Sequence, residues 1–455
     1  MDKKIIFVEP RGAEANVFSK YMNLPLLGPV YLATILKSGG YDAAVINENM
    51  LGRDVNESDL NCDFLGISIL TNTAPRGYEI ARMFRKANPA GTIIIGGIHA
   101  SCMPGEALQY ADYVVKGEGE SAILDIVEGR AEKGVVCGKA PANLDEIPAP
   151  DMRLLRNHEK IRYFPVMLSR GCPFNCNFCS VTAMFGRGYR FVSDGRALSE
   201  LANAPTGRIF IYDDNFAASP SRTERLLDRI IGCGRKFRLR AQVRTDITKR
   251  PDIVKKMKEA GFSVVYVGIE SINEDSLISM NKRQSVDDIR RAVEVFNKNG
   301  IKVHGMFIFG TDTDRTGVFE DTVRFCRKEE IYTAQFLALT PLPGTPVFDG
   351  LNAAGRLLHK EWQYYDGQHV VFRPKNMSVS ELQDGILHSY KTFYSYVSMA
   401  DDIFKIAFES VYNLPDAVTK QFGKIQNKLM ARFIVNRWIK ANKGYFAMLK
   451  KGTAT

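Results

Sequence analysis

Short apolar runs alternate with helical patterns along the first third of the chain. Over residues 1–135, each apolar run ends in a polar or glycine-rich turn, and a segment with helical spacing of its apolar positions follows. This order predicts a parallel sheet whose strands are joined by crossover helices. The expected strands of this sheet are Ile5–Val8, Ala43–Ile46, Phe64–Ile69, Thr92–Ile95 and Tyr113–Val115.

A second series of strand and helix patterns begins at Arg162. Six such units predict a partial parallel (β/α) barrel, in which functional residues gather at the carboxyl ends of the strands. Residues from Ser380 onward carry helical patterns. The expected barrel strands are Tyr163–Leu168, Arg208–Tyr212, Arg238–Val243, Ser263–Gly268, Lys302–Phe309 and Ala334–Leu339.

These patterns predict an α/β protein with an N-terminal Rossmann-like doubly wound parallel sheet, then a partial (β/α)6 barrel, then a mainly helical C-terminal segment. Between the two series, residues 140–155 contain three prolines, alternating charge and little periodicity, as in a linker. The expected domains are residues 1–139, a linker over 140–160, the barrel over 161–350, and a helical region with a basic tail over 351–455.

Composition narrows the class of protein. A chain of 455 residues with 45% hydrophobic residues can bury two or three cores. Its first apolar run is shorter than that of a signal peptide, and no uncharged run reaches the roughly 18 residues of a membrane span. Eight cysteines in so long a chain do not form a disulfide framework, so we expect a cytoplasmic protein.

Three cysteines follow the first expected barrel strand at C-x3-C-x2-C spacing: Cys172, Cys176 and Cys179. Thiolates select zinc, copper(I) or iron–sulfur clusters. Zinc normally takes four ligands in paired C-x2-C units, and no second pair follows here. Three cysteines can hold a four-iron cluster that leaves one iron open for an external ligand. Three structural cysteines are the alternative.

This spacing, with Phe178 before the last cysteine, resembles the signature of the radical S-adenosylmethionine superfamily. The resemblance implies a [4Fe-4S] cluster on the three cysteines, with S-adenosyl-L-methionine bound to the open iron. It further implies reductive cleavage to a 5′-deoxyadenosyl radical, and a one-electron reductant such as flavodoxin or ferredoxin.

Polar side chains stand where the second and third expected barrel strands end. Asp213 and Asp214 are adjacent carboxylates that need a cation nearby, and in the family this position receives the ammonium group of S-adenosylmethionine. Helix capping by Asp214 or Asn215 is the alternative. Arg244 could bind the methionine carboxylate with its two-pronged guanidinium, or pair with Asp246.

Two further strand ends complete the S-adenosylmethionine site that the resemblance implies. Glu270 follows the fourth strand, where it could accept hydrogen bonds from the ribose hydroxyls, and Ser271 stands beside it. A plain surface carboxylate is the alternative for Glu270. Leu339, at the end of the sixth strand, lies in a segment similar to the family's adenine contacts.

The N-terminal third resembles the cobalamin-binding domain that precedes one branch of this superfamily. Ligands of open α/β sheets bind at the carboxyl-end loops, where glycine lets the backbone approach closely. The stretches that carry the resemblance are Leu24–Leu32, Asp63–Ser68, Ile95–Ala100 and Gly117–Glu120. The cobalamin contacts that it implies are Ser68, Thr71, Gly96, Gly97, His99, Gly117, Glu118 and Gly119.

One feature of cobalamin proteins with a histidine below the cobalt is missing. Their D-x-H-x-x-G motif does not occur in this sequence. The resemblance is therefore to the branch that binds the corrinoid with its base displaced and no histidine on cobalt, and His99 is interpreted as a hydrogen-bonded loop residue. Some enzymes of this architecture have the domain without using the corrinoid.

Three further cysteines support a rival interpretation. Methylthiotransferases hold a second cluster on three widely spaced N-terminal cysteines, and this chain has Cys62, Cys102 and Cys137. Free cysteines are commonly small buried hydrophobes, which is the alternative.

The resemblance implies an enzyme that uses the radical to functionalise an unactivated carbon of a small molecule or lipid, with methylation as the leading outcome. Cyclisation, C–C coupling, oxidation or rearrangement without methyl transfer are alternatives. A non-catalytic corrinoid- or cluster-binding sensor or carrier is an alternative of another class. The chain shows no Ser/His/Asp triad or P-loop, and six scattered histidines argue against histidine-based hydrolysis.

The C-terminal region offers candidates for substrate and membrane contact. Tyr365 and His369 lie in an aromatic stretch that either roofs the active site or packs on the barrel. From Lys420 to Lys451 there are nine basic residues and no acid, interspersed with apolar residues. The first four (Lys420, Lys424, Lys428 and Arg432) recur every four positions and so share one helix face. Such a helix can lie in a membrane interface, or it can pack on the barrel with a solvated basic face. With no recognition motif, nucleic acid is not expected.

Overall fold

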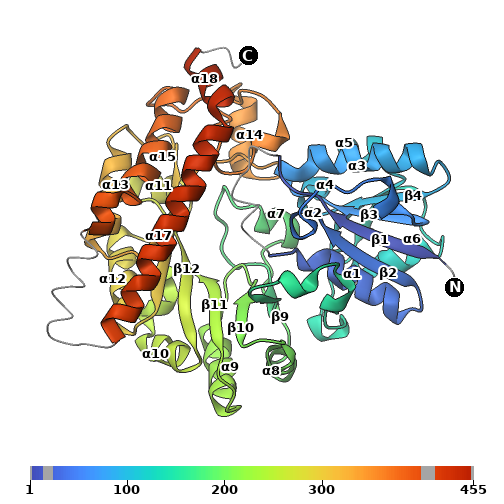
Figure 1. Ribbon diagram of the computed structural model, residues 1–455, viewed down its shortest axis with the longest axis horizontal. Helices are drawn as coiled ribbons and strands as arrows, with labels where there is room; N and C mark the ends of the chain where they lie inside the picture. The colour runs from blue at the N-terminus through green and yellow to red at the C-terminus, as the bar shows by residue number, and fades with distance from the viewer. Residues whose placement is uncertain (1–2, 14–23, 401–415, 452–455) are drawn as a thin grey trace.

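The computed structural model describes residues 3–13, 24–400 and 416–451, with the side chains of the last segment described from Ile425 onward. Figure 1 shows two sheets side by side, with a long helix running across the second. The predicted fold class is confirmed: a parallel N-terminal sheet is followed by a second parallel sheet and a helical C-terminal region.

The first sheet has six parallel strands in the order β2-β1-β3-β4-β5-β6. The strand order reverses between β1 and β3, and open α/β sheets bind ligands beside such a point. The sixth strand was not expected from the sequence, because it begins and ends with glycine and lies half-exposed at the sheet edge. The strands are β1 (Lys4–Glu9), β2 (Asp42–Asn47), β3 (Phe64–Ser68), β4 (Thr92–Gly96), β5 (Tyr113–Gly117) and β6 (Gly134–Gly138).

Helices cover both faces of this sheet, and apolar residues of alternate strand positions fill the two layers. The helices are α1 (Leu27–Ser38), α2 (Glu48–Leu51), α3 (Ala74–Ala87), α4 (Ile98–Cys102), α5 (Pro104–Ala107) and α6 (Ile123–Val127).

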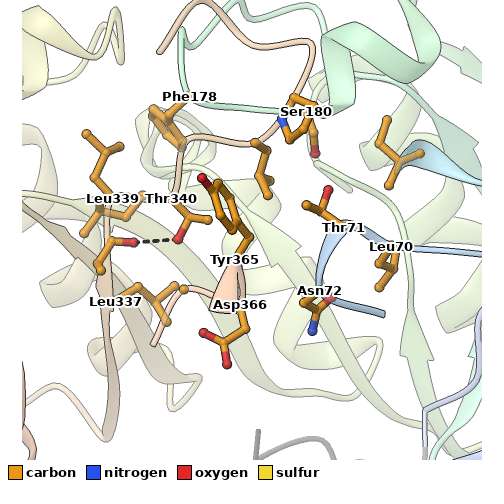
Figure 2. Close-up of a pocket in the computed structure, with 16 residues that line it drawn as sticks. Leu70, Thr71, Asn72, Phe178, Ser180, Leu337, Leu339, Thr340, Tyr365 and Asp366 are labelled. Carbon is orange, nitrogen blue, oxygen red and sulfur yellow. Dashed lines mark hydrogen bonds between the residues drawn. The ribbon is translucent and has the colours of Figure 1, made fainter. Parts of the chain in front are cut away.

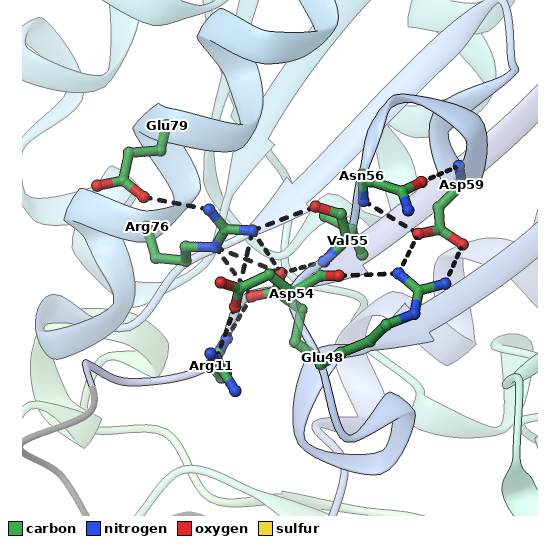
Figure 3. Close-up of polar contacts among 9 residues, drawn as sticks. Arg11, Glu48, Asp54, Val55, Asn56, Asp59, Arg76 and Glu79 are labelled. Carbon is green, nitrogen blue, oxygen red and sulfur yellow. Dashed lines mark hydrogen bonds and ion pairs between the residues drawn. The ribbon is translucent and has the colours of Figure 1, made fainter.

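A fully buried carboxylate fastens α2 to α3. Glu48 accepts hydrogen bonds from the backbone of Arg11 and Val55, and Arg76 of α3 donates to it at 2.8 Å (Figure 3). Arg76 also pairs with Glu79 at 3.1 Å. A buried carboxylate is stable only when it is paired and hydrogen-bonded in this way, so we interpret this cluster as structural.

Residues 140–160, which the sequence predicted as a linker, pack on elements of the first sheet. The amide of Asp151 donates to Thr34 Oγ1 of α1 at 2.9 Å, and Leu155 forms an isolated bridge with Val45 of β2. Leu155 is fully buried. These contacts fix the direction in which the chain enters the second sheet.

The second sheet also has six parallel strands, in the order β14-β13-β12-β11-β10-β7. No pairing joins its two edge strands, so it is an open barrel, as the six predicted units require. Its strands are β7 (Phe164–Val166), β10 (Arg208–Ile211), β11 (Arg238–Val243), β12 (Phe262–Glu270), β13 (Lys302–Phe309) and β14 (Thr333–Ala338).

Helices and a short antiparallel ribbon surround this barrel. The ribbon pairs β8 (Ser169–Arg170) with β9 (Arg190–Phe191) on either side of the cysteine loop. The helices are α7 (Val181–Phe185), α8 (Asp194–Asn203), α9 (Pro220–Gly232), α10 (Pro251–Glu259), α11 (Glu274–Ser279), α12 (Val286–Lys298) and α13 (Val318–Lys328).

The described helices of the C-terminal region are α14 (Pro346–Ala353), α15 (Val379–Phe393), α17 (Asp416–Ala441) and α18 (Lys443–Lys451). Helix α15 packs on strand β14, and α17 and α18 pack on α15. Trp438 and Phe446 are buried. The sequence placed Lys428 on one helix face with Lys420, Lys424 and Arg432, a face expected to meet either a membrane or solvent. Neither environment fits Lys428, which is 3% exposed and donates to Ser398 Oγ at 3.0 Å. The side chains of Lys420 and Lys424 lie outside the described residues.

Within the described part of the chain, the helices are too short or too polar for any of them to span a membrane.

Candidate functional site

The cysteine loop begins at a glycine that no other residue could replace. Gly171 has φ +83°, and a Cβ there would lie 2.2 Å from the carbonyl oxygen of Gly188. Asp213, at the end of β10, accepts hydrogen bonds from the amides of Leu168 and Ser169 at 2.7 and 2.9 Å. The loop that carries Cys172 therefore starts from a fixed backbone.

The three cysteines fit an iron–sulfur cluster in their chemistry. Burial raises the pKa of Cys172, and raises that of Cys179 to about 12, with a further rise from the neighbouring thiols. Cluster assembly therefore has to release protons. No three His, Cys, Asp or Glu side chains of the described residues are gathered as around a single metal ion. A four-iron cluster binds each thiolate through a different iron, so its ligands need not meet at one point.

Arg244 lies beside the cysteine loop. Its Nη1 is 3.9 Å from Cys176 Sγ, and its guanidinium stacks 3.8 Å from the centre of the Phe174 ring. It also pairs with Asp246 at 2.8 Å, which is the ion pair that the sequence left open. Arg244 is thus held next to a cluster ligand, and its role toward S-adenosylmethionine stays a prediction.

The two carboxylates after β10 differ in their surroundings. Asp213 is fully buried, and its Oδ2 has no hydrogen-bond partner among the described residues. Asp214 accepts a hydrogen bond from the amide of Gly171 at 3.2 Å, and burial raises its pKa to about 6. Both sites favour a cation nearby, because burial penalises the charged carboxylate.

Glu270 takes an unusual backbone conformation at the end of β12. Its φ is +64°, rare for a residue with a side chain. Its carboxylate pairs with Lys282 at 2.6 Å, and a Cβ at Gly268 would lie 2.5 Å from Glu270 Oε1. Ser271, next in the chain, is buried and accepts a hydrogen bond from the amide of Asn273. The predicted ribose contacts of both residues stay predictions.

A cavity of about 330 Å³ lies between the two domains, and two of the predicted S-adenosylmethionine residues, Phe178 and Leu339, line it. Figure 2 shows the loop after β3 facing the end of β14 across this space, with Tyr365 between them. The walls are mainly apolar. The residues that line it come from the first domain (Leu70, Thr71, Asn72, Ile98), the cysteine loop (Phe178, Ser180), the barrel (Ile308, Leu337, Ala338, Leu339, Thr340, Leu342, Pro343) and the C-terminal region (Tyr365, Asp366, Gly367).

His99 is fully buried and is not among the residues that line this cavity. Its Nδ1 is 3.3 Å from Thr71 Oγ1, and its Nε2 is 3.4 Å from Glu106 Oε1. Glu106 also accepts a hydrogen bond from Trp362 Nε1 at 3.0 Å. Both ring nitrogens are engaged within the protein, so the first domain fits a corrinoid that has no histidine on cobalt.

The other predicted corrinoid contacts lie on the loops at the carboxyl edge of the first sheet. Gly97 has φ +96°, and a Cβ there would lie 2.6 Å from the carbonyl oxygen of Ile69. Ser68 and Gly96 end β3 and β4, and Gly117 ends β5 with φ +86°. Gly119 lies just beyond Glu118, whose carboxylate pairs with two arginines.

Tyr365 and His369, the two predicted substrate contacts, lie in different surroundings. Tyr365 lines the cavity, and its hydroxyl donates to the carbonyl of His359 at 2.5 Å. His369 is fully buried, with Nδ1 2.9 Å from Asp366 Oδ1 and Nε2 2.7 Å from Asn442 Oδ1. Burial disfavours its charged form, but Asp366 raises the pKa of His369 above its usual value. His369 therefore holds Asp366 and the cavity wall in place.

Sequence reasoning missed several residues of the cavity, among them Asn72, Ser180, Thr340 and Asp366. Each stands within two residues of a predicted site residue. The sequence signal that could have found them was therefore their closeness along the chain to predicted site residues (Thr71, Phe178, Leu339 and Tyr365).

The rival second cluster does not fit the fold. Cys62 precedes β3 and Cys102 follows β4, so they lie at opposite ends of a parallel sheet. Five-residue strands separate these ends by roughly 16 Å. Cys137 is exposed on β6.

Comparison with known proteins agrees with both halves of this site. The model of the Radical SAM superfamily matches residues 166–326, and that of the B12 binding domain matches residues 16–127. An uncharacterized methyltransferase of Pyrococcus horikoshii is 30% identical over 410 residues, covering 81% of this chain and 88% of the relative. Bacteriochlorophyllide d C-12(1)-methyltransferase of Chlorobaculum tepidum is 27% identical, covering 86% and 87%.

A solved structure shows the same fold over the whole chain. The cobalamin-dependent S-adenosylmethionine radical enzyme OxsB, with aqua-cobalamin and S-adenosylmethionine bound, superposes with a TM-score of 0.69 at 15% identity. The match covers 100% of this chain and 82% of OxsB. The chain belongs to the cobalamin-dependent branch of the radical S-adenosylmethionine superfamily. Its cofactors are accordingly a [4Fe-4S] cluster, S-adenosyl-L-methionine and cobalamin, and it is an enzyme similar to methyltransferases.

Proposed function

We propose that this enzyme methylates an unactivated carbon of an apolar small molecule or lipid, held in the cavity between the two domains. The residues that line the cavity are the observation that supports this proposal. Residues of the cysteine loop (Phe178) and of the corrinoid domain (Thr71) line the same space, and its walls are mainly apolar. A substrate carbon there would be within reach of both cofactor sites.

The chain's own residues bind and orient in this reaction. When bound, the reduced cluster and S-adenosylmethionine supply a 5′-deoxyadenosyl radical, and the corrinoid supplies the methyl group. Cys172, Cys176 and Cys179 would hold the cluster, and Arg244 lies beside Cys176. The apolar walls exclude water, which protects a reactive intermediate.

We assign the S-adenosylmethionine contacts to the residues that face the cysteine loop. Asp214 reaches the backbone of that loop, and Phe178 and Leu339 line the cavity. Leu339 also borders a second cavity of about 330 Å³ together with Asn177 of the cysteine loop and Thr311 beyond β13. This second cavity is where we place the adenine, since the family's adenine contacts resemble these strand ends.

Anaerobic reconstitution with iron, sulfide and cobalamin tests this function. We expect iron–sulfur and corrinoid absorbance in one spectrum, and 5′-deoxyadenosine after reduction. Ile308→Trp, which fills the cavity, should abolish methylation of an added apolar extract yet keep cluster and corrinoid absorbance. Ile278→Trp is the matched control, because Ile278 is 75% exposed on α11. Full methylation by Ile308→Trp would contradict the proposed site.

We also propose that the C-terminal region contacts an anionic membrane. Its support is a set of exposed apolar side chains, which we call the apolar patch: Leu429, Met430 and Phe433 on α17, and Tyr396 and Val397 beyond the end of α15. Two arginines border this patch, with Arg432 4.2 Å from the Tyr396 ring and Arg437 5.7 Å from the Phe433 ring. Apolar groups beside basic ones are the pattern of an interfacial surface.

Liposome co-sedimentation of the full chain tests this contact. We expect binding to vesicles of phosphatidylserine and phosphatidylcholine that weakens with salt and is lost in Leu429→Asp/Phe433→Asp. Ile278→Asp, on another exposed helix, is the control and should bind like the wild type. Equal binding by both variants would contradict the contact.

The reductant we propose is a flavodoxin or ferredoxin.

A further inference from the structure

Two arginines face each other on the ribbon that carries the cysteine loop. In the β8–β9 pair, Arg170 is directly opposite Arg190. Like charges at directly opposite positions destabilise an antiparallel pair. Arg170 immediately precedes Gly171 and Cys172, so any opening of this ribbon would move the first cluster ligand.

A carboxylate of the other domain lies between these arginines. Glu118 Oε2 accepts from Arg170 Nη1 at 2.6 Å, and Glu118 Oε1 pairs with Arg190 Nη2. Glu120 accepts from the second Nη of Arg170 at 2.6 Å. The side chains of Glu118 and Arg170 are 3% and 6% exposed. Since these charges are buried, removing one partner leaves another charge unpaired out of water.

The corrinoid domain fixes the position of Glu118 from the other side. Gly117 has φ +86°, and a Cβ at Gly138 would lie 1.9 Å from the carbonyl oxygen of Glu118. The Glu118 backbone thus packs against β6. Gly117 and Gly119, its two neighbours, are among the predicted corrinoid contacts. One residue therefore joins a corrinoid loop to the start of the cluster loop.

We propose that Glu118 is a positioning residue that couples the corrinoid loop Gly117–Glu120 to the cluster loop, so that corrinoid binding and cluster retention depend on each other. Its carboxylate neutralises the repulsion between Arg170 and Arg190, which lets the ribbon close and sets the position of Cys172. By linkage, the factor by which a bound cluster raises the affinity for cobalamin equals the factor by which bound cobalamin raises the affinity for the cluster. The coupling rests on the two-cofactor function proposed above.

The first test uses the cofactor-free protein, so it stands even if the proposed methylation fails. In Glu118→Gln, which keeps the shape but not the charge, hydrogen exchange over residues 169–171 and 190–192 should be about tenfold faster or more. Glu120→Gln is the matched control, since Glu120 binds Arg170 alone and should have a smaller effect. Unchanged exchange in Glu118→Gln would overturn the proposal.

A double variant separates charge repulsion from misfolding. In Glu118→Gln/Arg190→Leu the second arginine is gone, and Arg170 still pairs with Glu120, so exchange and cluster retention should return toward wild type. If Glu118→Gln proves insoluble, this variant decides alone: a soluble protein that retains its iron supports the proposal, and loss of iron overturns it.

The coupling itself is read from corrinoid affinity. The Kd of cobalamin should differ by about fivefold or more between cluster-loaded and cluster-free wild-type protein. In Glu118→Gln/Arg190→Leu, the two Kd values should be equal. The same ratio in both proteins would overturn the coupling.

Discussion

Two regions of the interface between the domains differ in the chemistry of their side chains. On one side, the cavity has mainly apolar walls with neutral polar groups such as Thr71 and Thr340, and Asp366 turns its carboxylate toward His369. On the other side, Glu118 lies between Arg170 and Arg190, buried and fully paired. Directional charge contacts thus align the domains outside the reaction space. The proposed substrate cavity can therefore keep mainly apolar walls, which suits an apolar substrate.

Removing the cluster ligands should have the largest effect, and it should abolish the chemistry without changing the contact between the domains. Cys172→Ala, Cys176→Ala and Cys179→Ala should each abolish 5′-deoxyadenosine formation and lose the cluster iron, because three ligands leave no spare. Chromatography and iron analysis after anaerobic reconstitution measure both. Cys62→Ala, Cys102→Ala and Cys137→Ala are the controls. Loss of about four irons in any control would revive a second cluster.

A positive charge placed in the wall of the mainly apolar cavity should lower methylation without touching the ion pairs of Glu118. Leu337→Lys puts an ammonium in the cavity wall, and an apolar substrate would then leave that charge desolvated. At a cost of about 3 kcal/mol, methylation should fall about 100-fold. Leu337→Met, similar in volume and uncharged, should stay within about threefold of wild type. A similar rate for the two variants would show that substrate does not meet this wall.

The barrel interior should be acid-sensitive because it keeps a histidine neutral. His304 lies on the β13 face that also carries Ile308, and burial lowers its pKa to about 4. The unfolded chain takes up a proton near pH 6.5 and the folded one only near pH 4. Stability is therefore complete above pH 6.5 and falls as the pH drops, by about 2 kcal/mol at pH 5. Urea unfolding of wild type and His304→Gln measures this, and equal pH dependence of the two would contradict it.

The smallest effect should come from the contact between the corrinoid domain and the C-terminal region. Trp362→Phe removes the indole N–H that donates to Glu106 but keeps the ring packing against His99. We expect a loss of about 1 kcal/mol in the free energy of unfolding, with cofactor content unchanged. Thermal denaturation measures it, with Trp362→Leu, which also loses the ring, as the more damaging comparison.

The parts of the fold that follow from periodicity were predictable, and those set by tertiary contacts were not. The strand predicted over Lys302–Phe309 matches β13, and its positions alternate between buried and half-buried. Strand β6 carries two glycines and too little apolar bulk to stand out. The cluster ligands could be predicted because the three cysteines lie close together in the sequence, at a characteristic spacing. The pairing of Glu118 with Arg170 spans 52 positions and two domains, so no local pattern could indicate it.

The C-terminal tail shows the same limit. The basic spacing of its helix suggested one solvated face, yet Lys428 is buried against Ser398 and the Phe393 ring. A helix that packs on two neighbours cannot be divided into faces by its own sequence, because its partners decide which residues are covered.

The most direct test of the central claim is a labelled methyl transfer. The reconstituted, reduced enzyme would be incubated without oxygen with S-adenosyl-L-[methyl-d3]methionine and an organic extract of the source cells, and the products analysed by mass spectrometry. We expect an apolar product in which a CD3 group replaces one hydrogen, formed together with 5′-deoxyadenosine and absent in Cys176→Ala. An apolar product altered without the label would contradict methylation, and the labelled product formed equally by Cys176→Ala would contradict the radical route.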